Sequence, residues 1–376
     1  MLHGSLRFLA CLLATTLLSA LLIMPSAAVY PAISAECACL YLPQTDTFIY
    51  QKNADRRHPM ASTTKIVTAL AVLSTCSLAD TVTVAPEAVG VEGSSVYLKA
   101  GEQFRVEDLL YALLLASAND AAAALAIHVS GSVEGFADLM NETAASLSLT
   151  DTHFTNPHGL YDEEHYTTAA DLARISAAAM ENEDFARIVS TKSKVITSLD
   201  GETVRTLQNH NKLLRLYKDA TGIKTGFTKK SGRCLVSAAE RNGLRLIAVT
   251  LDAPDDWRDH TALLDLGFSL YRGYIAADED IRYEIPVVGG ETESISLSPK
   301  TPVTLVLPKE APEPVLTVEI NRFAVAPIRA GQVLGMAYYT VNGKTVAKIP
   351  LLADGDVPAA VQKNSLLDKI KHFFNL

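Results

Sequence analysis

The stretch Ala61-Ser62-Thr63-Thr64-Lys65-Ile66-Val67-Thr68-Ala69-Leu70 decides how the rest of the chain is interpreted. Apolar residues recur in it at helical spacing, so we expect a helix that begins at Ser62. Residues three apart share a helix face, which puts the Ser62 hydroxyl beside the Lys65 amine. Burial lowers the pKa of a lysine, and the neutral amine can then take a serine proton. Because Ser-x-x-Lys is frequent by chance, the stretch alone favours a helix cap and a solvated lysine.

Composition describes a globular protein of moderate acidity. The chain has 376 residues, of which 48% are hydrophobic and 20% charged, and its net charge is −9. This length suggests two domains. The acidic balance argues against a nucleic-acid partner, which would favour a basic surface.

The N-terminus has the pattern of an export signal. Arg7 precedes an apolar run over residues 8–23, and small residues follow it. We expect a signal peptide over residues 1–35, cleaved after Ala35 rather than after Ala28, because strand-like sequence follows at once. Retention as a membrane anchor is the alternative, although the run is short for a span.

The five cysteines form no disulfide framework. Cys37 and Cys39 make a C-x-C pair, while Cys76 and Cys234 are isolated and Cys11 lies in the signal. A C-x-C pair without further ligands is a weak metal signal. We therefore expect buried free thiols.

Two further polar motifs follow the first one. Ser117-Ala118-Asn119 interrupts an apolar helical region, and Lys224-Thr225-Gly226 precedes two predicted strands that form a hairpin. Asn119 or Asp120 could simply cap the second helix; alternatively, the short turn presents Ser117 and Asn119 to a cleft. Gly226 leaves room for a ligand beside the strand backbone.

A histidine-rich segment and the C-terminal third carry weaker signals. His153, His158 and His165 lie near acidic residues, but their spacing fits no common metal site. Short strands separated by turn residues predict an all-β module over residues 274–357, which we expect to be a sandwich. Residues 358–376 have one apolar and one lysine-bearing face, which indicates a helix on a membrane surface or, alternatively, one packed on the β module.

Taken in order, the three motifs resemble those of the low-molecular-mass penicillin-binding proteins, specifically the D-alanyl-D-alanine carboxypeptidases. The resemblance is strong over residues 36–273 and looser beyond them. It is supported by the stretches at residues 59–65, 156–160, 168–173 and 219–226. It implies an α/β (α+β) penicillin-binding, transpeptidase-like domain over residues 36–273, with an antiparallel sheet and a helical subdomain. A small all-β sandwich and a C-terminal amphipathic helix would follow.

The resemblance also implies a role for each motif residue. Ser62 would be the acylated nucleophile, Lys65 its general base, and Ser117 a proton relay toward the leaving D-alanine. The substrate-binding residues would be Asn119, Lys224, Thr225, Gly226, Phe227 and His210. Asn119 would orient the substrate amide, Lys224 would supply positive charge, and Thr225 would bind the terminal carboxylate. The N–H groups of Ser62 and Phe227 would form the oxyanion hole.

Two positions depart from the pattern of some relatives. Phe227 stands where some carry histidine, which affects the shape of the pocket but not its N–H donor. His210 stands where some place an arginine near the substrate carboxylate. If His210 has that role, carboxylate binding would weaken above its pKa, because a neutral imidazole adds little.

The function implied is that of an exported serine-type carboxypeptidase that removes the terminal D-alanine from peptidoglycan pentapeptides. It would act on the outer face of the cytoplasmic membrane, bind β-lactams at Ser62, and need no metal or organic cofactor. A D,D-endopeptidase is chemically close. A serine β-lactamase is less favoured, because no glutamate-x-x-x-asparagine element lies between Ser117 and Lys224. A non-enzymatic wall-binding scaffold would require a broken motif, and none is broken.

Overall fold

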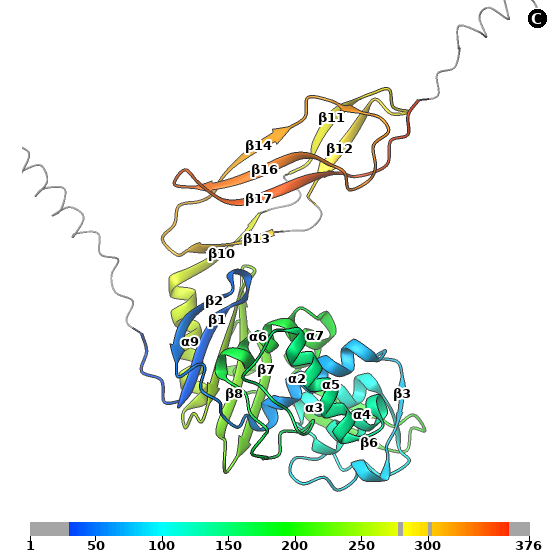
Figure 1. Ribbon diagram of the computed structural model, residues 1–376, viewed down its shortest axis with the longest axis vertical. Coiled ribbons are helices and arrows are strands. Elements are labelled where there is room, and N and C mark those ends of the chain that lie inside the picture. Colours follow the sequence, from blue (N-terminus) through cyan, green and yellow to red (C-terminus); the bar gives the residue numbers. More distant parts are fainter. Residues whose placement is uncertain (1–29, 277–280, 300–302, 361–376) are drawn as a thin grey trace, which may run out of the picture. The chain divides into compact units, whose positions relative to one another are not determined.

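A computed structural model describes residues 30–276, 281–299 and 303–360 (Figure 1). The chain divides into two compact units, residues 1–33 and residues 34–376, and all helices and strands of the described residues belong to the second. Nearly all of the expected signal peptide and of the expected C-terminal helix lies outside the described residues. None of the helices within them is both long and apolar enough to cross a membrane.

A five-stranded antiparallel sheet organises the first domain. Its strand order is β2-β1-β9-β8-β7. The strands are β1 (Cys37–Leu42), β2 (Thr47–Lys52), β7 (Ala220–Thr228), β8 (Gly232–Arg241) and β9 (Leu244–Leu251). The predicted hairpin of β8 and β9 is confirmed. Residues 36–52, in which two apolar runs flank a polar turn and so predict a second hairpin, form the hairpin of β1 and β2. Asn242 and Gly243 both have positive φ, as a tight hairpin turn requires.

Helices cover both faces of this sheet. Helix α9 (Asp256–Leu270) packs on one face, and α6 (Ala169–Met180) and α7 (Glu183–Ser190) pack on the other (Figure 1). Strand β1 is buried along its whole length. Its cysteines Cys37 and Cys39 are free and buried, as is Cys234, in agreement with the expectation of buried thiols; Cys76 is free but only half-buried.

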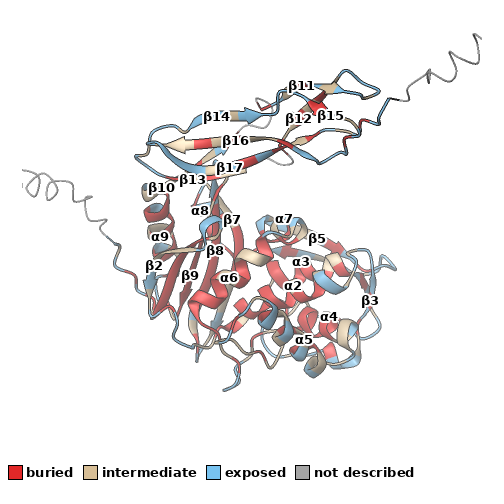
Figure 2. Cartoon of the chain, turned by 45° about the horizontal axis from the view of Figure 1, so that its top comes forward, coloured by how far each residue is buried: buried red, intermediate tan, exposed pale blue. Residues whose placement is uncertain are grey.

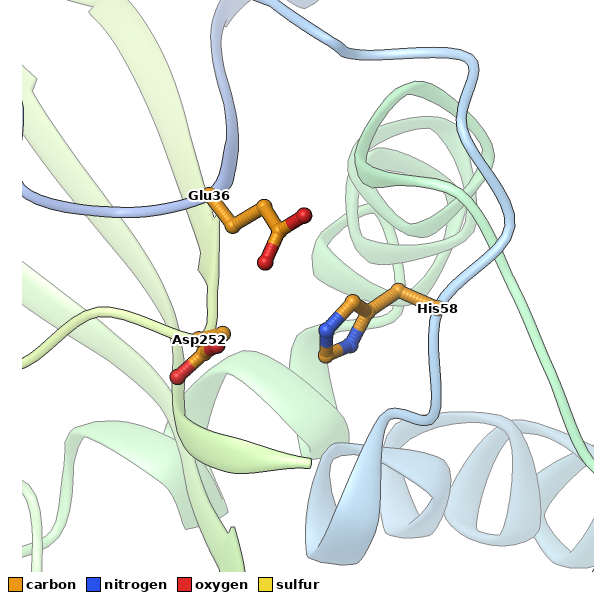
Figure 3. Close-up of side chains that lie close together, drawn as sticks. All are labelled: Glu36, His58 and Asp252. Carbon is orange, nitrogen blue, oxygen red and sulfur yellow. The ribbon is translucent and has the colours of Figure 1, made fainter. Parts of the chain in front are cut away.

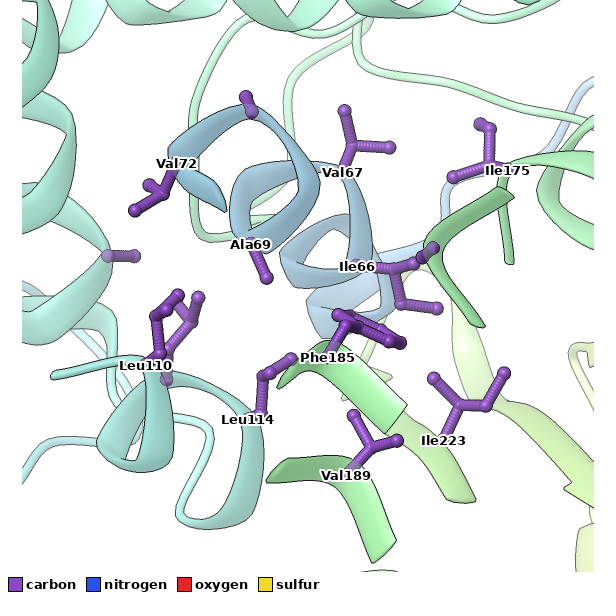
Figure 4. Packing of buried hydrophobic residues seen from close by; sticks show 14 of the residues in the cluster. Ile66, Val67, Ala69, Val72, Leu110, Leu114, Ile175, Phe185, Val189 and Ile223 are labelled. Atoms are coloured by element: carbon purple, nitrogen blue, oxygen red, sulfur yellow. The ribbon is translucent and has the colours of Figure 1, made fainter. Parts of the chain in front are cut away.

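A helical subdomain surrounds α2 (Lys65–Thr75). Its other elements are β3 (Thr81–Thr83), β4 (Gln103–Arg105), α3 (Val106–Leu115), α4 (Asn119–Ser130), α5 (Val133–Ser146), β5 (Ser193–Thr197), β6 (Val204–Gln208) and α8 (Leu213–Leu216). Most of α2 is buried, as Figure 2 shows, because neighbours surround it. In Figure 4, Ile66 and Val72 of α2 lie among side chains of α3, α7 and β7, such as Leu110, Phe185 and Ile223. A helix that is apolar on most sides must be buried on most sides, and the surrounding core thereby holds α2 in position.

The C-terminal region is an all-β module, as predicted. It contains a six-stranded sheet of order β14-β16-β17-β12-β11-β15 and a two-stranded ribbon of β10 and β13. The strands are β10 (Tyr271–Ala276), β11 (Tyr283–Val288), β12 (Ser294–Ser298), β13 (Val303–Pro308), β14 (Val315–Ile320), β15 (Ala324–Val325), β16 (Val333–Val341) and β17 (Lys344–Ala353). Buried residues such as Leu297, Ala337 and Leu351 give it a core of its own.

Three local predictions are wrong. The α-helix begins at Lys65, not at Ser62, which lies in a 3₁₀ turn over Ala61–Thr64. Residues 95–98, whose sequence Ser-Val-Tyr-Leu predicts a short strand, form none, because the Asp120 carboxylate accepts hydrogen bonds from the N–H groups of Val96 and Leu98. For the same reason Asp120 is not the cap of α4; the N-cap position is Ala118.

Candidate active site

The nucleophile candidate Ser62 lies in the 3₁₀ turn that precedes α2. Its neighbour Ala61 has φ of +49°, which an L-residue rarely adopts. The turn directs Ser62 toward Lys65, so that the Ser62 Oγ and Lys65 Nζ are 3.0 Å apart. A 3₁₀ turn aligns residues three apart even more closely than an α-helix does. The predicted pairing of Ser62 with Lys65 is therefore present, although the local geometry differs.

Lys65 is fully buried, and its amine has oxygen atoms on three sides. Nζ lies 2.7 Å from Asn119 Oδ1 and 2.6 Å from the backbone oxygen of His158. Burial lowers the pKa of Lys65 well below its ordinary value, and the nearby Lys224 lowers it further. The two carbonyl oxygens can only accept, so they take both N–H bonds of a neutral amine. The nitrogen lone pair is then left for the Ser62 hydroxyl proton.

A second lysine and hydroxyl face each other across the cleft. Lys224 Nζ lies 3.1 Å from Ser117 Oγ and 2.9 Å from the backbone oxygen of Thr225. Ser117 has φ of +61°, in the short turn between α3 and α4. Burial lowers the pKa of Lys224 to about 7. At neutral pH Lys224 is thus partly charged, and this charge adds to burial in lowering the pKa of Lys65.

Asn119 connects the turn after α3 to the Lys65 amine and to the backbone at Glu92. Its Oδ1 accepts from Lys65, and its Nδ2 donates to the backbone oxygen of Glu92. The side chain is buried, so it cannot swing freely. Its position at the first residue of α4 explains why a helix-cap reading of the sequence was reasonable, but both polar atoms of the amide have other partners.

Strand β7 comes unusually close to the start of α2. A side-chain carbon added at Gly226 would lie 3.0 Å from the Ser62 nitrogen and 3.1 Å from the Thr63 nitrogen. The absence of a side chain at Gly226 thus favours this close approach of the protein's own nucleophile turn, whereas the sequence predicted room for a ligand there. The Phe227 side chain next to it is 66% exposed, so it borders the cleft without filling it.

Ser62, Ser117 and Gly226 open onto one cavity of about 340 Å³, whereas the buried Lys65, Asn119 and Lys224 lie behind its lining. It is lined by Ser62, Ser94, Ser117, His210, Lys212, Thr225, Gly226, Phe227, Arg233, Asp256 and Trp257. The structure thus brings His210 to the same cavity as Thr225. Burial, and then the neighbouring Lys224, lower the pKa of His210 below its usual value.

Sequence reasoning missed the far rim of the cavity. Arg233 binds Asp256 through contacts of 2.7 and 2.8 Å, and Trp257 follows. Arg233 and Asp256 are 23 positions apart in the chain. The sequence also did not reveal that the His158 carbonyl accepts a hydrogen bond from Lys65. This contact uses a backbone oxygen, so it cannot be predicted from the residue type at position 158.

One group of potential metal ligands lies away from this cavity. Glu36, His58 and Asp252 face a common space, with their ligand atoms within 4.8 Å of one another (Figure 3). Bonds of about 2.1 Å to a tetrahedral ion place ligand atoms about 3.4 Å apart, so a trio this wide would have to contract. The Glu36 carboxylate already pairs with Arg56. The trio is therefore better explained as a polar cluster beside the start of β1 and the end of β9.

Comparison with known proteins agrees with this arrangement. A family model described as D-alanyl-D-alanine carboxypeptidase (peptidase S11) matches residues 24–255, more than half of the chain. A second model, the C-terminal domain of penicillin-binding protein 5, matches residues 273–359.

Individual relatives extend over most of the chain. The D-alanyl-D-alanine carboxypeptidase DacF of Bacillus subtilis is 29% identical over 88% of this chain and 87% of its own length. DacC of Escherichia coli, of the same description, is 31% identical over 86% of this chain and 84% of its own. The solved structure of penicillin-binding protein 5 from Haemophilus influenzae is 30% identical, with a TM-score of 0.64, over 87% of this chain and 98% of that one. This chain belongs to the D-alanyl-D-alanine carboxypeptidase family of serine hydrolases.

Proposed function

We propose that this protein removes the terminal D-alanine from peptidoglycan stem peptides through an acyl-enzyme at Ser62. The Ser62 oxygen attacks the carbonyl of the D-Ala-D-Ala bond while its proton passes to the neutral Lys65 amine. The oxyanion is stabilised by the N–H groups of Ser62 and Phe227. Ser117 relays this proton from Lys65 to the leaving nitrogen as the bond breaks, so Lys65 is neutral again when D-alanine leaves. Water then hydrolyses the ester and restores Ser62.

The observation that carries this proposal is the environment of the Lys65 amine. It has two carbonyl acceptors at 2.6 and 2.7 Å and the Ser62 hydroxyl at 3.0 Å. A protonated amine would donate to all three oxygens and could not take the serine proton. Burial favours the neutral form, in which the lone pair faces the nucleophile.

The other side of the cavity suits the carboxylate end of the peptide. Lys224 supplies charge, the Thr225 hydroxyl donates a hydrogen bond, and Asn119 orients both the substrate amide and Lys65. Because the pKa of His210 is lowered, its ring is neutral at pH 7 and adds little charge there. The pH dependence expected from His210 thus falls below neutrality. A substrate KM that responds to pH through His210 only above pH 7 would contradict this assignment.

We further propose that the protein is exported and that its C-terminal helix binds the membrane surface. The Ser34 and Ala35 N–H groups and the Ser34 hydroxyl donate to the Asp259 carboxylate of α9. These contacts favour signal cleavage after Ala28, since cleavage after Ala35 would remove them. N-terminal sequencing of the exported protein separates the two sites, and flotation with anionic vesicles, with and without residues 358–376, tests the membrane helix.

The direct test is intact mass after incubation with penicillin, on wild type and on Ser62→Ala. We expect one adduct on wild type and none on the variant, together with D-alanine release from a D-Ala-D-Ala peptide by wild type alone. No adduct on folded wild type would contradict the mechanism. An adduct lost within seconds would indicate a β-lactamase, and cleavage of cross-linked muropeptides without D-alanine release would indicate an endopeptidase.

A further inference from the structure

A buried histidine outside the three motifs contacts the nucleophile turn. His165 lies in the segment before α6, is 2% exposed, and does not line the cavity. Its Nε2 lies 2.8 Å from the Thr64 hydroxyl oxygen, which itself lies 2.8 Å from the backbone oxygen of Ala61. A chain of hydrogen bonds therefore connects this histidine to the residue before the nucleophile.

The direction of every hydrogen bond in this chain is fixed. The Thr155 N–H donates to His165 Nδ1 at 3.0 Å, so that nitrogen carries no proton. Burial lowers the pKa of His165 to about 4, so the ring is neutral and its one proton lies on Nε2. Nε2 therefore donates to the Thr64 oxygen. The Thr64 hydroxyl has one proton, and it donates to the Ala61 oxygen.

The Ala61 oxygen belongs to the peptide unit whose N–H is that of Ser62. A trans peptide unit is planar, so fixing its C=O also fixes the direction of its N–H. A hydrogen bond accepted by the C=O also strengthens the N–H as a donor. This unit needs such support, because Ala61 has φ of +49°.

Contact with a glycine confirms how tightly this oxygen is held. A side-chain carbon at Gly159 would lie 1.9 Å from the Ala61 oxygen and 2.8 Å from the Thr64 hydroxyl oxygen. Gly159 follows His158, whose carbonyl accepts from Lys65. The segment from residue 155 to residue 165 thus contacts the nucleophile turn at two groups. One is the amine of the base, Lys65, and the other is the Ala61 oxygen, which it reaches through Thr64.

We propose that His165, through the Thr64 hydroxyl, orients and polarises the Ala61–Ser62 peptide so that the Ser62 N–H is a prepared oxyanion donor. His165 is thereby a positioning residue for the reaction. The inference rests on the proposed role of the Ser62 N–H in the oxyanion hole. Loss of the chain should slow the steps that form a tetrahedral intermediate and leave the initial binding of the ligand unchanged.

Two substitutions at His165 separate its two hydrogen bonds. His165→Gln can place an amide N–H near the Nε2 position and keep the donor to Thr64. His165→Asn can place an amide oxygen near the Nδ1 position and keep only the acceptor for Thr155. We expect acylation by saturating penicillin to be about 10-fold slower in the Asn variant and within about threefold of wild type in the Gln variant. Thr64→Val should behave like the Asn variant, and Thr64→Ser like wild type.

The readouts distinguish positioning from folding. The penicilloyl adduct should also be hydrolysed about 10-fold more slowly in His165→Asn, because deacylation uses the same oxyanion donor. The dissociation constant of the initial penicillin complex should not change. Combining His165→Asn with Thr64→Val should add no further loss, since both break one chain. His153→Gln is the control, because His153 lies just before this segment and its ring bonds the Glu164 backbone oxygen rather than Thr64.

Equal acylation rates in the Asn and Gln variants, or a wild-type rate in Thr64→Val, would overturn this inference while Ser62→Ala still fails to form an adduct. An adduct that persists in Ser62→Ala would overturn the proposed function and this inference with it. Changes confined to the melting temperature or to the initial dissociation constant would likewise overturn it, because they indicate a structural role alone.

Discussion

Each of the two sides of the cleft carries a buried lysine next to a serine hydroxyl, yet the two lysines have different chemical roles. On the nucleophile turn, Lys65 lies 3.0 Å from Ser62; on strand β7, Lys224 lies 3.1 Å from Ser117. Lys65 has two carbonyl acceptors besides, and Lys224 has one. The pKa of Lys65 falls well below its usual range, partly because of Lys224, whereas burial lowers that of Lys224 to about 7.

The comparison teaches that the surroundings of a buried lysine, not the residue type, decide its role. Carbonyl oxygens that cannot donate leave a neutral amine with its lone pair toward the hydroxyl, which makes Lys65 a base. The pKa of Lys65 is lowered by the positive charge of Lys224 as well as by burial, whereas burial alone lowers that of Lys224. Lys224 therefore retains more charge and suits an anionic substrate end. The predictions below test this division.

The largest expected effect is that of Lys65→Arg. A guanidinium does not lose its proton at working pH, so acylation by penicillin should fall about 10³-fold. The matched change Lys224→Arg keeps the positive charge and should lose only about 10-fold, through altered shape. Stopped-flow acylation rates measure both. Equal losses in the two variants would contradict the assignment of Lys65 as the base and Lys224 as the source of positive charge.

Gly159→Ala should be next in size. The added carbon would lie 1.9 Å from the Ala61 oxygen, so the segment carrying the His158 carbonyl must move away from Lys65. A displacement of this order is expected to slow acylation about 100-fold. Gly201→Ala is the matched control, because Gly201 also has positive φ but open space around it. Similar losses in both variants would assign the effect to backbone strain instead.

The pH dependence of substrate binding should report on Lys224. Its pKa of about 7 in the free enzyme means that positive charge is present below pH 7 and lost above it. We expect the KM for a D-Ala-D-Ala peptide to rise about 10-fold between pH 6 and pH 8.5 in wild type. In Lys224→Arg the rise should disappear over this range. A flat KM for wild type would show that the charge comes from elsewhere.

The smallest expected effects concern stability. The pKa of Lys224 is about 7 when folded and 10.5 ordinarily, so between these values the unfolded chain binds more protons and stability rises with pH. Lys224→Met removes this rise and should stabilise the protein at pH 7 by about 1–2 kcal/mol. Lys65→Met should gain less, because it leaves the oxygens of Asn119 and His158 without their donor. Urea unfolding at pH 7 and pH 9.5 measures both, and equal gains would contradict the account.

Much of the fold could be predicted from the sequence, because apolar periodicity and turn residues report local structure directly. The hairpin of β1 and β2, the helix after Lys65 and the all-β C-terminal module were found in this way. The strand predicted over residues 95–98 was wrong, because the buried Asp120 carboxylate takes the N–H groups that a strand neighbour would use. Long-range hydrogen bonds of this kind have no local pattern.

The motif residues of the site were available to sequence reasoning, but the atoms that set their chemistry were not. The Ser62–Lys65 spacing pointed to the pair, whereas the His158 carbonyl and the His165–Thr64 contact depend on a segment about 90 to 100 positions away. The histidines were weighed as metal ligands, since spacing was the only property on hand. The structure uses a backbone oxygen of one and the ring of another to hold the nucleophile turn.

The most direct test of the central claim is the rate of acylation by saturating penicillin as a function of pH. A neutral Lys65 already has its lone pair available, so the rate constant should change less than about twofold between pH 8.5 and pH 10.5. A rate that climbs about tenfold per pH unit over this range would mean that Lys65 titrates like an ordinary lysine. That result would contradict the account of Lys65 as the base for Ser62.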